Sequence, residues 1–229
     1  MCGRTALSAP PEDLRELFRL DETPSISPRY NIAPTQPIPI LRELSGRTGR
    51  RIELLRWGLV PAGSIGPTAG APLINARRES LTSRPPFRDA MRWRRCLVIV
   101  DGFFEWRREG KSTNQPYFVR RADKRPFAIA GLWEKWTSRD GEIIESCVVI
   151  TMPATPPIDQ IHDRMPVIVA DDDWAAWLDA RATEARMLEP ILHPAPPRDL
   201  VMEAVSTRVN SPANDDIECI APAKDTSLF

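Results

Sequence analysis

The chain has 229 residues with 31 basic and 31 acidic side chains, 24 prolines, four cysteines and two histidines. No apolar run approaches the roughly 20 residues that a membrane-spanning helix needs, and no secretory leader is visible, so we expect a cytoplasmic protein without a membrane partner. Four cysteines without a CxxC pair argue against a disulfide scaffold or a zinc ribbon, and two histidines argue against a His-rich metal site.

Charge is distributed unevenly along the chain. Residues 1–125 contain 23 Lys and Arg against 13 Asp and Glu, whereas residues 126–229 contain 8 against 18. Of the basic residues 27 are Arg, whose planar guanidinium suits phosphates and base stacking, although genomic base composition explains an Arg excess equally well. Sequence halves are not surfaces, but a basic half is what a nucleic-acid face requires.

Short apolar runs bounded by Gly, Pro or Asp predict the strands of a mainly antiparallel sheet or barrel. They lie at residues 38–41, 52–57, 97–100, 103–107, 117–120, 127–133, 143–150, 166–169 and 201–209. Ser8 is the expected N-cap of a short amphipathic helix that presents Leu14, Leu17 and Phe18 on one face. Further helices are predicted at residues 171–178 and 183–192, and loops at residues 61–72 and 83–88.

No linker divides the chain, so we expect one α+β domain over residues 1–210. The polar residues 211–229 are expected to form a poorly ordered tail. The sequence contains no obvious interface pattern, which favours a monomer.

Cys2 is the first candidate for chemistry. Removal of Met1 would leave an N-terminal Cys that carries a thiol and an α-amine on adjacent carbons. The amine, with a reference pKa near 8, is partly neutral at cellular pH, and a thiolate is a strong nucleophile. With an aldehyde, the amine forms a Schiff base and the thiol then closes a thiazolidine ring. The alternative is that position 2 holds a Cys by chance.

Three further residues are candidates, each with a structural alternative. His162 precedes an apolar strand and would carry protons near neutral pH, or it makes a structural hydrogen bond there. Glu105 lies in an aromatic stretch where burial would raise its pKa and suit proton transfer, or it faces outward from a strand. Asn75 is suited to orienting a carbonyl or hydroxyl, or it is a turn residue.

Taken together, nine segments in chain order resemble the SRAP family, the SOS response-associated peptidase-like proteins. They are MCGR at 1–4, RYNIAPT at 29–35, WGLVP at 57–61, NAR at 75–77, RRCL at 94–97, DGFFEW at 101–106, AGLWE at 130–134, TMPA at 151–154 and HDRMP at 162–166. Each segment alone is a weak signal, whereas their joint order is a strong one.

The resemblance implies a compact α+β domain with a β-barrel-like core and a basic cleft for single-stranded DNA. It implies that Cys2 captures the aldehyde of an abasic site in a covalent thiazolidine cross-link, which shields the lesion during the DNA damage (SOS) response. Asn75 and His162 would place and protonate the sugar, and Glu105 would act as acid and base. Arg4, Arg77 and Arg164 would hold the flanking phosphates. No metal or other cofactor is implied.

Two other functions use the same features. The family is also linked to peptidase (hydrolase) and lyase activity, and turnover of an unrelated peptide that depends on His162 would favour a protease. A non-covalent single-stranded DNA-binding module would bind undamaged and abasic DNA equally tightly and form no covalent species.

Overall fold

A computed structural model describes residues 2–43, 49–67, 70–109, 113–197 and 199–223. Five strands close into a barrel in the order β10-β4-β3-β6-β9, because β9 pairs with β10 as well as with β6. All pairs are antiparallel except β4 with β10. The strands are β3 (Pro37–Glu43), β4 (Arg50–Trp57), β6 (Arg95–Val100), β9 (Phe127–Thr137) and β10 (Ile143–Pro153). The expected barrel-like and mainly antiparallel core is therefore confirmed.

The barrel is closed by dense apolar packing. Strand β6 is buried along its whole length, and its neighbour β9 and the next strand, β10, contribute long buried runs. At Gly131 the backbone of β9 lies close to both neighbouring strands. A Cβ there would meet the Cys96 sulfur at 3.1 Å and the Val148 carbonyl oxygen at 3.2 Å. A continuous core of this kind adds close apolar packing to the backbone hydrogen bonds that join the strands.

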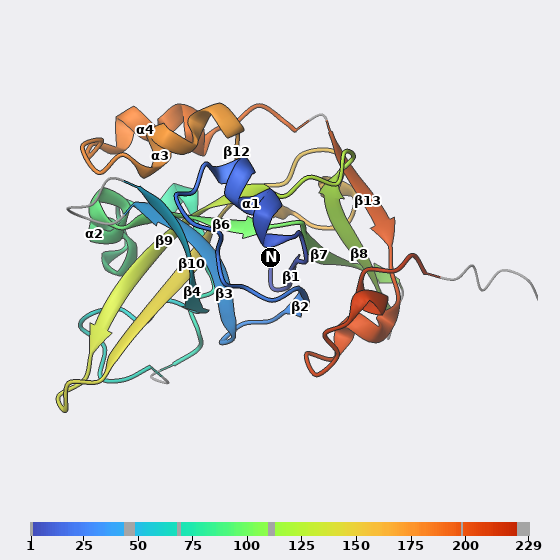
Figure 1. The fold of residues 1–229 in the computed structure, drawn as a ribbon, viewed down its shortest axis with the longest axis horizontal. Helices are drawn as coiled ribbons and strands as arrows, with labels where there is room; N and C mark the ends of the chain where they lie inside the picture. The colour runs from blue at the N-terminus through green and yellow to red at the C-terminus, as the bar shows by residue number, and fades with distance from the viewer. Residues whose placement is uncertain (1, 44–48, 68–69, 110–112, 198, 224–229) are drawn as a thin grey trace, which may run out of the picture.

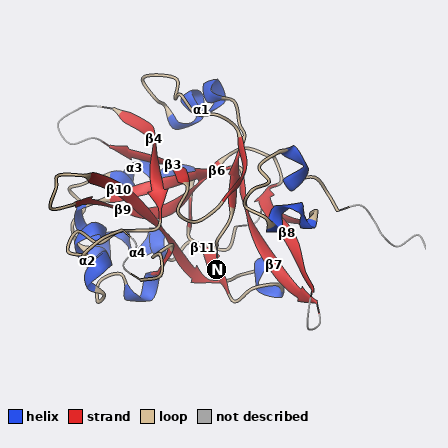
Figure 2. Ribbon diagram, turned by 90° about the horizontal axis from the view of Figure 1, so that it is seen from below, coloured by secondary structure: helices blue, strands red, loops and turns tan. Residues whose placement is uncertain are grey.

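A second sheet stands beside the barrel. Its order is β13-β8-β7-β1-β2, with β1 (Thr5–Leu7), β2 (Arg29–Ile32), β7 (Gly102–Glu109), β8 (Thr113–Arg121) and β13 (Leu200–Ala204). Figures 1 and 2 both show β7 and β8 on one side of the molecule and the barrel strands β9 and β10 on the other.

The side chains of β7 alternate between two apolar environments. Phe103 joins the main core, and Phe104 joins a smaller cluster on the opposite face together with Phe118 and Val209. Successive side chains of a strand point to opposite faces, so Glu105 lies on the same face as Phe103, toward the barrel. This alternation explains why a carboxyl side chain is buried between the two sheets, with 2% of its surface exposed.

Three short strands complete the edges of the barrel. β5 (Asn75–Arg77) runs parallel to β10, and β11 (Arg164–Pro166) runs antiparallel to it. β12 (Ile168–Val169) pairs with β9. Strand β10 therefore links the segment that holds Asn75 to the segment that follows His162, although 87 residues separate these two positions in the sequence.

Four α-helices and several single 3₁₀ turns surround the sheets. The α-helices are α1 (Pro11–Phe18), α2 (Pro85–Trp93), α3 (Trp174–Leu178) and α4 (Ala185–Leu192), and the 3₁₀ turns are η1 (Arg78–Ser80), η2 (Ile158–Gln160), η3 (Asp171–Asp173), η4 (Thr207–Asn210) and η5 (Ile217–Cys219). Helices α2 and α3 both pack against β6. Among the described residues, no helix is both long and apolar enough to cross a membrane.

Two predictions about helices are wrong. Ser8 does not cap α1; its backbone N–H and hydroxyl both donate to Asp101, and α1 begins after Pro10 without a side-chain cap. Residues 83–88 are not a loop, because α2 begins at Pro85. The prolines occupy the first turn of a helix, where a missing N–H costs nothing, and Phe87, Ala90 and Met91 are its buried face.

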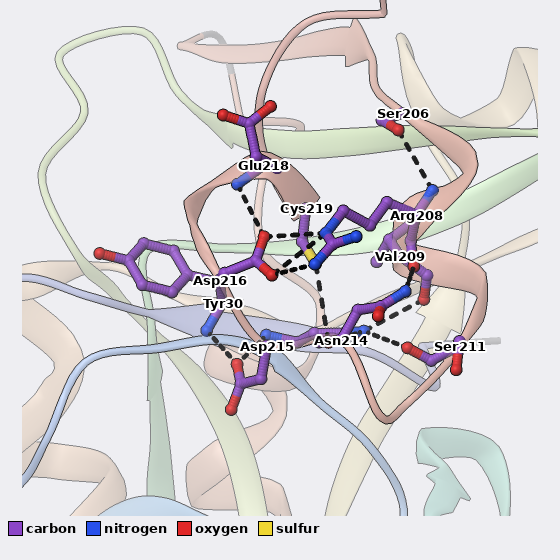
Figure 3. A network of polar contacts seen from close by, with 11 residues as sticks. Tyr30, Ser206, Arg208, Val209, Ser211, Asn214, Asp215, Asp216, Glu218 and Cys219 are labelled. Atoms are coloured by element: carbon purple, nitrogen blue, oxygen red, sulfur yellow. Dashed lines mark hydrogen bonds and ion pairs between the residues drawn. The ribbon is translucent and has the colours of Figure 1, made fainter.

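The chain after residue 210 also differs from the expected poorly ordered tail. The predicted last strand ends at Ala204, and residues 206–223 then fold back against β2 as a segment that we call the C-terminal clasp. The Asp215 carboxylate accepts hydrogen bonds from the backbone N–H groups of Tyr30 and Asn31 (Figure 3). Polar residues are ordered here because their partners are backbone groups of an otherwise unpaired strand edge. Residues 224–229 lie outside the described residues.

Candidate active site

Cys2 lies at the junction of the two sheets. Cys2 is fully buried and belongs to the main apolar core. Strand β1, which follows it, pairs with β7 so that Thr5 lies opposite Phe103, and the Phe104 N–H donates to the Arg4 carbonyl at 2.9 Å. This antiparallel register, continued toward the N-terminus, sets Gly3 opposite Glu105, and the charge of Glu105 acts on the thiol of the neighbouring Cys2.

Asn75 makes a direct contact with Cys2. Its Nδ2 donates to the Cys2 carbonyl oxygen over 2.8 Å, which ties β5 of the barrel side to the start of β1. The Asn75 Oδ1 atom is buried and has no hydrogen-bond partner among the described residues. A buried acceptor in this position is able to receive a hydrogen bond from a ligand.

Burial governs the protonation of Cys2 and Glu105. It raises the pKa of the Cys2 thiol far above its usual value, and the negative charge of Glu105 raises it further. Burial also raises the pKa of Glu105 to about 7, with a smaller contribution from the charge of Asp163. The direction of the Glu105 shift is the one that its apolar sequence context predicts. A carboxyl group with this pKa both gives and takes protons at cellular pH.

His162 lies in the loop that leads into β11. Its Nδ1 accepts a hydrogen bond from the Arg164 backbone N–H at 2.9 Å and also lies 2.9 Å from an Asp163 carboxylate oxygen. A neutral ring whose Nδ1 accepts carries its proton on Nε2, whereas a protonated ring donates from Nδ1 to the carboxylate. The influence of Asp163 on Glu105 places this loop near the junction of the sheets.

Arg164 is engaged in an ion pair. Its guanidinium forms a bidentate pair with Glu79, at 2.8 and 3.0 Å, and also donates to the Thr151 carbonyl at 2.7 Å. Its side chain is 11% exposed. This bidentate pair occupies the fork that a phosphate would need, so the geometry favours a positioning role for Arg164 over the predicted phosphate contact. The pair joins η1 to β11 and thereby the Asn75 and His162 segments.

The other two candidate arginines differ from Arg164. Arg4 is half-buried; its guanidinium donates to Asn31 and to the Val209 and Asn210 carbonyls and has no carboxylate partner among the described residues. Its positive charge is therefore not neutralised locally. Arg77 is exposed at the end of β5, two residues after Asn75, where it is accessible to a phosphate.

Known proteins resemble this chain along most of its length. The family described as SOS response associated peptidase (SRAP) matches residues 1–212. The chain belongs to the SRAP family. The protein is 36% identical over 223 residues to the abasic site processing protein YoqW of Bacillus subtilis, covering 96% of this chain and 99% of that protein. It is 28% identical over 264 residues to the abasic site processing protein HMCES of Xenopus tropicalis, covering 96% and 78%.

Solved structures share the SRAP fold. A crystal structure of a Bordetella bronchiseptica protein superposes with a TM-score of 0.77 at 28% identity, covering 90% of this chain and 100% of that one. A Bacteroides thetaiotaomicron protein superposes with a TM-score of 0.83 at 21% identity, covering 97% and 100%.

The candidate site draws its parts from both sheets. Glu105 lies in the second sheet and Cys2 just before its strand β1, whereas the barrel edges provide Asn75 and the His162 loop. Sequence reasoning missed Glu79, Asp163 and Asn31, although Asn31 and Asp163 lie inside the motifs and Glu79 follows the NAR motif by two residues. Among the described residues, no group of three or more His, Cys, Asp or Glu side chains is arranged to hold a metal ion.

Proposed function

We propose that this SRAP protein captures abasic sites in single-stranded DNA by condensing the N-terminal amine and thiol of Cys2 with the aldehyde of the opened sugar. The observation that carries the proposal is Cys2 held by Asn75 beside Glu105, whose pKa of about 7 suits proton transfer in both directions. The names of the similar proteins, abasic site processing proteins, support the same substrate.

The raised thiol pKa determines the order of the steps. A thiol that is neutral at cellular pH is the weaker nucleophile, so after Met1 is removed the α-amine of Cys2 attacks the C1′ aldehyde first. The C–N bond forms, and the carbonyl oxygen becomes a hydroxyl with the proton lost by nitrogen. The Glu105 carboxyl then protonates this hydroxyl, which leaves as water, and an iminium ion remains beside a Glu105 carboxylate.

The same carboxylate completes the second step. It takes the proton of the Cys2 thiol as sulfur attacks the iminium carbon, and the C=N electron pair returns to nitrogen. A thiazolidine ring and a protonated Glu105 result, so Glu105 is regenerated. The net reaction forms one C–N and one C–S bond and releases one water, and it needs no oxidant or reductant.

Sugar and phosphates would contact different side chains. The buried Oδ1 of Asn75 would accept a hydrogen bond from a sugar hydroxyl, and His162 would help to place and protonate the sugar. Arg77 is accessible for a flanking phosphate, and the charge of Arg4 adds positive potential near the site. Contacts of this kind give salt-dependent binding with little sequence preference.

The test is covalent capture of single-stranded DNA that carries one abasic site, followed on denaturing gels. The wild-type protein should form an adduct that survives denaturation, and Cys2→Ala should form none without a reducing trap. Cys147→Ala is the matched control, because Cys147 is also fully buried and its thiol pKa is also raised. We expect this variant to retain the adduct.

Other results of these experiments would favour a different function. Stable capture by Cys2→Ala at the wild-type level would reject Cys2 as the nucleophile. Equal binding of undamaged and abasic DNA with no adduct would favour a non-covalent binding module. His162-dependent turnover of an unrelated peptide would favour a peptidase.

A further inference from the structure

Asn31 is the most heavily hydrogen-bonded side chain near Cys2. It lies on β2 and is fully buried. Its Nδ2 donates to the carbonyls of Val209, Ser211 and Asn214 at 3.2, 3.0 and 2.7 Å, and its Oδ1 accepts from the Arg4 guanidinium at 2.7 Å. The carbonyls belong to the C-terminal clasp, drawn in Figure 3. Asn31 therefore joins the clasp to the first residues of the chain.

Arg4 continues this connection toward the nucleophile. Its guanidinium donates to the Val209 carbonyl at 2.6 Å and lies over the Trp106 ring at 5.8 Å. One residue, Gly3, separates Arg4 from Cys2, and the Arg4 carbonyl accepts a hydrogen bond from the Phe104 N–H on β7. The segment that carries Cys2 is therefore restrained twice at Arg4. Asn31 binds the Arg4 side chain, and β7 binds the Arg4 backbone.

The clasp also holds the strand of the acid. Trp106, next to Glu105, donates from Nε1 to the Asn210 side-chain oxygen at 2.7 Å. Asn210 and the preceding Val209 therefore contact the immediate neighbour of Glu105 and the Arg4 side chain at once. Asp215 fixes the other side of Asn31, since its carboxylate accepts from the Asn31 N–H at 2.9 Å.

We propose that Asn31 is a positioning residue for the cross-linking reaction, and that the C-terminal clasp acts through it to hold the Cys2 amine and thiol in register with Glu105. This inference rests on the proposed condensation at Cys2. Asn31 is fully buried and cannot contact DNA, so its effect is on the rate of bond formation and not on DNA affinity. Misplacing reacting groups by about 1 Å costs roughly 100-fold in rate.

The experiment separates rate from affinity. The adduct-formation rate is measured at saturating single-stranded DNA with one abasic site, and the dissociation constant is measured on DNA with a tetrahydrofuran analogue that lacks the aldehyde. We expect Asn31→Ala to slow adduct formation by about 10- to 100-fold. We expect its dissociation constant to stay within about threefold of the wild type, since no DNA contact is removed.

A second pair of variants guards against misfolding of Asn31→Ala. Asn210 is exposed, and Asn210→Ala removes the acceptor of the Trp106 hydrogen bond, whereas Asn210→Asp retains an acceptor oxygen. We expect a rate several-fold slower for the first and a rate near the wild type for the second. A purely structural role predicts no such rescue in the rate per folded molecule.

The matched control for stability is Arg95→Met. Arg95 is also buried and also gathers carbonyls, donating to Trp177, Met91, Arg92 and Asp179, but it packs α2 and α3 against β6. We expect this variant to melt at a lower temperature and to react at the wild-type rate per folded molecule. An equal loss of rate in Arg95→Met would overturn the proposal.

The reaction of the wild-type protein distinguishes the positioning role of Asn31 from the proposed condensation at Cys2. If the wild type reacts and both Asn31→Ala and Asn210→Ala keep its rate, or lose rate only in proportion to affinity, the positioning role is wrong and the proposed function stands. If the wild type itself forms no adduct, the condensation at Cys2 is wrong and the inference falls with it.

Discussion

The barrel and the second sheet meet at Cys2, but different interactions stabilise each of them. The barrel closes around a continuous apolar core in which β6 is wholly buried. The outer face of the second sheet has only a small apolar cluster, and Asn31, Arg4 and Asp215 supply discrete hydrogen bonds there. Apolar packing tolerates the loss of one polar contact, whereas a register set by individual hydrogen bonds does not. Polar substitutions should therefore change chemistry at the second sheet and at the barrel edge that contacts Cys2, and mainly stability inside the barrel.

The largest effect is expected on the second sheet, at Glu105. Glu105→Gln preserves the shape of the side chain but cannot transfer a proton, so we expect adduct formation to slow by about 100- to 10,000-fold. Asp101→Asn is the matched control, because burial also raises the pKa of Asp101, which accepts bonds from Ser8 and Ala9 and takes no part in the proposed reaction. Single-turnover rates on abasic DNA provide the measurement, and equal losses in the two variants would contradict an acid–base role.

Glu105 should also make the stability of the protein depend on pH. Its pKa of about 7 in the folded state lies above the value of about 4.3 for an exposed Glu, so folded protein binds this proton more tightly than unfolded protein. Its contribution to the unfolding free energy is therefore complete at low pH and declines as pH rises through about 7, by up to about 3 kcal/mol.

Glu105→Gln removes this decline. We expect the variant to gain stability relative to the wild type between pH 4.5 and pH 8, as measured by denaturant unfolding at both values. A constant difference between the two proteins would show that the carboxyl group is not buried in this way.

Asn75 tests the barrel side of the junction. Asn75→Ala and Asn75→Asp both remove the Nδ2 donor to the Cys2 carbonyl, so we expect each to slow adduct formation by about 10- to 100-fold. Asn75 lies at the edge of the barrel, and its removal opens no apolar cavity. The melting temperature should therefore change little. A large stability loss that fully accounts for the rate would assign Asn75 to folding.

Arg77 should give the smallest effect. Because it is exposed at the end of β5, Arg77→Ala should weaken binding to single-stranded DNA several-fold and lower the slope of log affinity against log salt by about 1. The rate at saturating DNA should not change. Arg51→Ala, which removes an exposed arginine near the start of β4, is the control. Identical salt slopes for the wild type and Arg77→Ala would exclude a phosphate contact.

Local pattern in the sequence predicted most of the fold. Short apolar runs bounded by Gly, Pro or Asp identified the barrel strands, because strands that are buried on both faces need apolar side chains along their length. Helix α2 was missed although its signals were present: prolines in its first turn and Phe87, Ala90 and Met91 at helical spacing. The short strand β5 was missed because three residues paired in parallel with β10 leave no periodic signal.

The site was predicted from motif residues, but its geometry was not. The contact between Asn75 and Cys2 spans 73 positions and depends on how two sheets meet, which no local pattern encodes. The roles of Arg4 and Arg164 were predicted from neighbouring motif residues. Their side chains, however, bind partners that are distant in the sequence: Glu79 for Arg164 and carbonyls of the clasp for Arg4. The clasp itself was read as a tail, because its partners are backbone groups that side-chain composition does not reveal.

The most direct test of the account is the intact mass of the protein before and after incubation with single-stranded DNA that carries one abasic site. The account predicts a protein that has lost Met1, followed by an adduct whose mass equals protein plus DNA minus one water. It also predicts that this adduct withstands denaturation without a reducing trap. A protein without Met1 that binds the DNA yet yields no adduct of this mass would contradict the condensation at Cys2.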